Sequence, residues 1–162
     1  MPLVKNGAET ADRWSHVADE AELSDGAYVT LSLARFLAEA PRLGERNTHV
    51  GVRLAPDDDV APLEPFLQQI LLIEISFPKY TDGRGYSQAQ LLRRRHGYTG
   101  ELRAVGHVLR DQIFYMNRSG IDAYATARAD LPSVLEALKE YSEVYQPAAG
   151  GQVPVFRKRH GS

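Results

Sequence analysis

The residues best suited to chemistry lie in one loop near the middle of the chain, at residues 79–87. The loop contains two cations, a carboxylate, two glycines and, at its end, a tyrosine and a serine: Lys79, Arg84, Asp82, Gly83, Gly85, Tyr86 and Ser87. Glycines allow a close backbone approach, and a serine at a helix start leaves free N–H groups at the positive end of the helix dipole. Together these groups could hold a phosphate, a sulfate or a carboxylate.

A structural interpretation of the same loop is equally open. Asp82 and Ser87 could simply cap the turn, and Arg84 could form an internal salt bridge with Asp82, Glu101 or Asp111. The loop lacks the G-x-x-x-x-G-K-[ST] pattern of a Walker A motif, and it lacks the third glycine of a dinucleotide fingerprint. The anion would therefore be bound by charge and free N–H groups, without a known nucleotide motif.

A second group of polar residues follows the next predicted strand. Arg103, Arg110 and Gln112 are further candidates for ligand binding, and the candidates for acid–base catalysis are Asp82, His107 and Asp111. Asp111 could orient Arg103 or Arg84 toward a ligand. The alternatives are a surface histidine at position 107 and a buried structural pair at position 111.

Neither a metal site nor a nucleic-acid site is predicted. The five histidines show no metal-ligand spacing, and a helix start explains the three aspartates at residues 57–59. The arginines at residues 93–95, with Tyr86 and Tyr98 nearby, could touch nucleic acid, but the overall acidity argues against it. They lie where a helix should end, a place that favours cations in any case.

Charge is unevenly distributed along the chain, whose net charge is −2. Residues 1–78 carry 13 acidic and 6 basic side chains, residues 79–118 carry 3 and 8, and residues 119–162 carry 5 of each. A concentrated positive field in a mildly acidic protein favours an anion or an acidic partner surface.

Composition bounds the class of protein. The 162 residues suffice for one domain, and 43% hydrophobic and 25% charged residues are typical of a globular protein. We find no signal peptide and no apolar run long enough to span a membrane, so we expect a cytoplasmic protein. There are no cysteines, which excludes thiolate nucleophiles, Cys-ligated clusters and Cys haem ligands. No cofactor is evident.

Strands and helices alternate through the second part of the chain. Hydrophobic spacing predicts strands at residues 49–54, 71–77, 102–105 and 121–126, each followed by a helix, at about residues 57–70, 87–96, 107–119 and 131–145. Such alternation favours a mainly parallel sheet with flanking helices, either an open three-layer sheet or a half-barrel completed by dimerisation. Ligands would bind beyond the carboxyl ends of the strands.

We divide the chain into three parts. Residues 1–48 should form N-terminal strands and a short helix packed on the domain, with Trp14 and Val17 in one weak strand and residues 28–31 in another, which could make a hairpin. Residues 49–145 form the α/β core. We expect residues 146–162, which are rich in glycine, proline and basic residues, to form a partly mobile tail.

Five segments of the core resemble a known family: residues 77–87 (FPKYTDGRGYS), 91–93 (LLR), 100–106 (GELRAVG), 108–112 (VLRDQ) and 120–124 (GIDAY). Their order and spacing are similar to those of the bacterial domain of unknown function 934 family, over about residues 51–124. His107 and Ser119 depart from this family, which often has an acidic residue and a cysteine there. A mechanism relying on a carboxylate or a thiol at those positions does not transfer.

The resemblance implies a role beside sulfite reductase, because family members are encoded next to its haemoprotein and are often named oxidoreductases. Reducing equivalents need a cofactor, however, and this chain has no cysteine cluster, haem motif or full dinucleotide fingerprint. We therefore expect an accessory protein that docks on sulfite reductase or its electron donor and binds a small anion at the 79–87 loop. The alternatives are an enzyme acting on a phosphorylated or sulfated metabolite, or a flavin- or nicotinamide-binding subunit.

Overall fold

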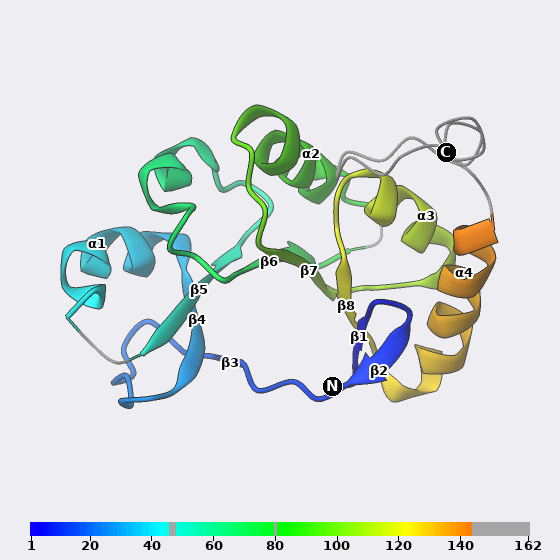
Figure 1. Ribbon diagram of the computed structural model, residues 1–162, viewed down its shortest axis with the longest axis horizontal. Coiled ribbons are helices and arrows are strands. Elements are labelled where there is room, and N and C mark those ends of the chain that lie inside the picture. Colours follow the sequence, from blue (N-terminus) through cyan, green and yellow to red (C-terminus); the bar gives the residue numbers. More distant parts are fainter. Residues whose placement is uncertain (46–47, 80, 144–162) are drawn as a thin grey trace, which may run out of the picture.

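One mainly parallel sheet of eight strands organises the molecule in the computed structural model, which describes residues 1–45, 48–79 and 81–143 (Figure 1). Its spatial order is β2-β1-β8-β7-β6-β5-β4-β3. The strands are β1 (Leu3–Lys5), β2 (Ala8–Thr10), β3 (Ser15–His16), β4 (Tyr28–Ser32), β5 (His49–Leu54), β6 (Leu72–Phe77), β7 (Glu101–Gly106) and β8 (Ala123–Ala125). The predicted tail, residues 146–162, lies outside the described residues.

Strands β3 to β8 are parallel and follow one another in chain order, whereas β1 and β2 form an antiparallel hairpin beside β8. The predicted α/β class, with a mainly parallel sheet and flanking helices, is confirmed. Of the two predicted architectures, the sheet follows the half-barrel, because it is curled and its helices lie along one side (Figure 1).

The helices follow the predicted alternation, with differences in type. They are α1 (Leu33–Leu43), the 3-10 helix η1 (Ala61–Phe66), α2 (Arg84–Gln90), the π-helix η2 (Leu91–Arg95), α3 (Arg110–Arg118), the 3-10 turn η3 (Arg128–Asp130) and α4 (Leu131–Glu143). Prolines 62 and 65 lie inside η1, where missing N–H donors disfavour the predicted regular helix. Helix α1 is the short helix predicted in the N-terminal part, and it continues through Pro41.

The N-terminal part was predicted least well. A short strand, β3, lies between Trp14 and Val17, where we predicted a weak strand, but it pairs in parallel with β4. The hairpin that we considered there is therefore wrong. The hairpin is instead made by β1 and β2, which the hydrophobic pattern did not reveal. All these strands belong to the same sheet as the core.

The two faces of the sheet differ sharply. Ile73 and Ile75 of β6 belong to a hydrophobic core shared with the helices, while Glu74 between them points to the opposite face. That opposite face, here called the inner face, also carries the buried Thr30 and Arg103. The sequence thus packs apolar side chains under the helices and charges inside the curl.

A four-residue connection explains how far the sheet must curl. Residues 11–14, here called the strap, join β2 at one edge of the sheet to β3 at the other (Figure 1). A flat sheet of eight strands would be about 34 Å wide, but the chain from Thr10 to Ser15 can reach only about 18 Å. The two edges must therefore approach each other across the inner face.

Candidate functional site

In the predicted anion loop, Arg84 and Asp82 form an ion pair with each other. Arg84 donates from Nε and Nη2 to the two carboxylate oxygens of Asp82, at 3.1 and 2.8 Å, and its backbone N–H bonds the same carboxylate at 3.1 Å. These bonds from Arg84 lower the pKa of Asp82 to about 2. The structural alternative for this pair is therefore the one observed, and Arg84 is not a free cation.

The other residues of the loop also have local roles. Helix α2 begins at Arg84 with Gly83 as its N-cap, so Ser87 lies inside the helix and the expected serine cap is wrong. A side chain at Gly85 would meet the ring of Phe77 at 2.7 Å, so this glycine lets the helix approach strand β6. Lys79 is exposed, and residue 80 lies outside the described residues.

The second predicted group separates in space. Arg110 bonds both carboxylate oxygens of Glu140 at 2.9 Å and joins α3 to α4, and this partner raises its pKa. His107 and Asp111 are exposed, and Gln112 is half-buried. Arg103 lies in mid-strand on the inner face, so the structure does not bring it to the 79–87 loop.

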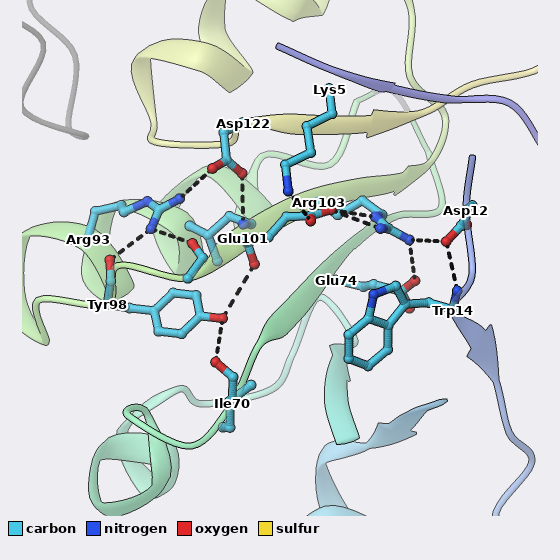
Figure 2. A network of polar contacts seen from close by, with 12 residues as sticks. Lys5, Asp12, Trp14, Ile70, Glu74, Arg93, Tyr98, Glu101, Arg103 and Asp122 are labelled. Atoms are coloured by element: carbon cyan, nitrogen blue, oxygen red, sulfur yellow. Dashed lines mark hydrogen bonds and ion pairs between the residues drawn. The ribbon is translucent and has the colours of Figure 1, made fainter. Parts of the chain in front are cut away.

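Arg103 is the centre of a buried charge network on the inner face (Figure 2). Its guanidinium contacts Glu101 at 2.9 Å, Asp12 of the strap at 3.0 Å and Glu74 at 3.8 Å. Glu101 also pairs with Lys5 at 2.9 Å. The network thus ties strands β1, β6 and β7 to the strap.

The network continues from Glu74 to the β3 edge. The Glu74 carboxylate accepts bonds from Arg53 Nε at 2.7 Å and from the Thr30 hydroxyl at 2.9 Å, and Thr30 Oγ1 lies 3.1 Å from His16 Nδ1. Since the single hydroxyl proton of Thr30 goes to Glu74, neutral His16 must carry its proton on Nδ1. Gly51 leaves room for this link, because a side chain there would contact Thr30 and Leu72.

The arginine run at residues 93–95 divides between two environments. Arg93 is largely buried and donates to the carbonyl oxygens of Tyr98, Gly100 and Gly120 at 2.8, 2.8 and 2.9 Å, beside the carboxylate of Asp122 (Figure 2). Burial raises the pKa of Asp122 although Arg93 opposes the shift. Arg93 is thus structural, whereas Arg94 and Arg95 are exposed.

A groove of about 420 Å³ lies between the α2–η2 helix and α3, on the outer side of the molecule. Its lining consists of two arginines, two tyrosines, an amide and a hydroxyl, namely Arg94, Arg118, Tyr86, Tyr115, Gln90 and Ser119. Of these, only Tyr86 was a predicted site residue. The one-turn spacing of residues 86 and 90 was a signal in the sequence, but the π turn that adds Arg94 and the meeting with α3 were not.

Comparison with known proteins places the chain in a family. The profile of the family described as bacterial protein of unknown function (DUF934) matches residues 51–156, and the chain belongs to this family. No curated protein matches the chain. Among the described residues, no helix is both long enough and apolar enough to cross a membrane.

Proposed function

We propose that this family member is a cytoplasmic accessory protein of assimilatory sulfite reduction, which docks on the reductase or its electron donor through a basic helical face. That face comprises Leu91, Arg94 and Arg95 of η2 with Tyr115 and Arg118 of α3. The role in sulfite reduction comes from the resemblance described above, and the docking face comes from the structure.

The observation that supports docking is that the arginines on this face have no carboxylate partner among the described residues. Within the part of the chain that the structure describes, Arg94, Arg95 and Arg118 take part in no ion pair, unlike Arg84, Arg93, Arg103 and Arg110. Leu91 and Tyr115 beside them are 40% and 59% exposed. Arginine and tyrosine next to exposed apolar surface are typical of protein interfaces.

The alternative of an enzyme that acts on a phosphorylated or sulfated metabolite has less support at the predicted anion site. It relied on Lys79, Arg84 and Arg103 to bind an anion, but Asp82 neutralises Arg84 and three carboxylates surround Arg103. The flavin or nicotinamide alternative used the same loop for its phosphate and is weakened for the same reason.

The docking proposal predicts a salt-sensitive complex. The tagged full-length chain should recover the reductase or its electron donor from native cells at low salt, and the complex should dissociate at 1 M salt, where the Debye length is about 3 Å. Arg95→Glu should weaken recovery, because charge reversal places like charges against an acidic partner.

The matched control is Arg128→Glu, which makes the same charge change at an exposed arginine paired with Glu9 on strand β2. This variant should recover the partner as the wild type does. The proposal fails if neither redox protein co-purifies and reductase activity is unchanged on adding the chain.

A further inference from the structure

The groove between the α2–η2 helix and α3 has the volume of a small-molecule site and a mainly polar lining. Its volume of about 420 Å³ falls within the range of about 300–1,000 Å³ found for ligand pockets. Its lining combines two guanidinium groups with two phenol rings, and Gln90 and Ser119 add further polar groups. The question is whether these groups are held in place and what they would select.

Tyr86 and Ser119 on the groove walls are held in place by packing and by a hydrogen bond. The Tyr86 ring packs against Phe77 at 5.2 Å between centroids, and burial raises its pKa, with Tyr115 as a further cause. Ser119 is 3% exposed, and its hydroxyl donates to the Tyr115 carbonyl oxygen at 2.8 Å. A wall that is already ordered loses little conformational entropy when a ligand binds.

Arg118 and Arg94 are positioned in two different ways. Arg118 lies over the Phe114 ring at 5.6 Å, a cation–π contact that restrains it without neutralising its charge. Arg94 is placed by the π-helical turn η2. In a regular α-helix, Arg94 would be rotated about 80° from Tyr86, but the wider π turn advances less per residue and returns it to the same wall.

The chemistry of the lining selects an anion attached to a ring. Two guanidinium groups that lack a carboxylate partner among the described residues favour a phosphate or sulfate group, to which arginine donates paired hydrogen bonds. Two phenol rings beside them favour a flat, apolar moiety. We propose that this groove binds a small organic phosphate or sulfate ester that carries a planar ring.

Phenyl phosphate and phenyl sulfate are the simplest probes with both features. Titration of the full chain, followed by NMR or calorimetry, should show saturable binding that is tighter than that of inorganic phosphate or phenol alone. Arg94→Gln and Arg118→Gln should each raise Kd about tenfold, since each removes a charge-assisted hydrogen bond.

The control is Arg95→Gln, which removes one positive charge from the same turn but lies outside the groove lining. Its Kd should stay near the wild-type value, and the melting temperatures of all three variants should agree. Absence of saturable binding, or an equal loss in the Arg95 variant, would overturn the proposal. Because the titration needs only the purified chain, its result is independent of whether the chain docks on a redox protein.

Discussion

Individual arginines of this chain have very different environments despite their identical chemistry. Arg103 is 2% exposed and surrounded by three carboxylates, and Arg93 is bound mainly by carbonyl oxygens. Arg94 and Arg118 meet at an open groove. Counting positive charges along the sequence correctly located a basic segment, but only contacts show which charges remain available to a partner.

The contacts that could be predicted at this scale are the local ones. The Asp82–Arg84 pair spans two residues and was anticipated as the structural alternative. Arg103 pairs with Asp12, 91 residues away, and no local pattern encodes that distance. A glutamate and an arginine in the middle of apolar strands, at positions 74 and 103, were nevertheless a readable sign of buried charge.

The Asp82–Arg84 pair makes a prediction about acid titration. NMR titration should give Asp82 a pKa of about 2, and Arg84→Ala should return it toward its ordinary value by removing the bonds that favour the carboxylate. Since the folded-state pKa is depressed, the pair's contribution to stability is present above the ordinary pKa. It is lost as the pH falls through about 2.

The control variant is Arg110→Ala, which removes a different exposed guanidinium and should leave the Asp82 titration unchanged. An Asp82 pKa that is insensitive to Arg84→Ala would contradict the assigned cause.

At the scale of elements, helix and strand identity followed from hydrophobic spacing, and the exceptions have physical reasons. Strands β1 and β2 contain only three residues each, too few for alternation to be recognised. The π turn η2 was read as ordinary helix, because periodicity over five residues does not separate the two. Curvature depends on strand neighbours far apart in sequence, so the two architectures could not be distinguished.

The approach of α2 to β6 depends on a glycine inside the helix. Gly85→Ala should destabilise the protein by about 1–3 kcal/mol, because the new methyl group would overlap Phe77 and Ile75 in a packed core. The higher helix propensity of alanine opposes this loss but amounts to only about 1 kcal/mol. Urea unfolding measures the difference.

Gly83→Ala is the matched control in the same turn. The nearest atom to a side chain there is 4.0 Å away, on Tyr86, so the change should cost much less. Equal losses at the two positions would show that packing against β6 is not the cause.

At the scale of the whole molecule, the strap holds the curled sheet closed on its open side. Asp12 on the strap bonds Arg103 on β7 at 3.0 Å, and the same carboxylate accepts the backbone N–H of Trp14. One side chain thus fixes both the conformation of the strap and its attachment to the inner face.

Asp12→Ala should therefore loosen the strap. Trp14 is the only tryptophan, so acrylamide quenching of its fluorescence should increase in the variant. The free energy of unfolding should fall by about 1.5–3 kcal/mol, as expected for a bond to a charged group.

The comparison variant is Glu9→Ala, which removes an exposed carboxylate paired with Arg128 just before the strap. It should cost at most about 1 kcal/mol and leave the quenching unchanged. The same increase in quenching in both variants would contradict a specific role for Asp12.

The strap also reduces the loss of chain entropy when β1 pairs with β8. Leu3 pairs with Ala125, and closing a loop of that length in a free chain carries a large entropic cost. Once strands β3 to β8 have assembled and curled, however, the β1–β2 hairpin is tethered four residues from the β3 edge. The pairing that is most distant along the sequence then becomes a local event in space, because the assembled sheet has already brought its two ends together.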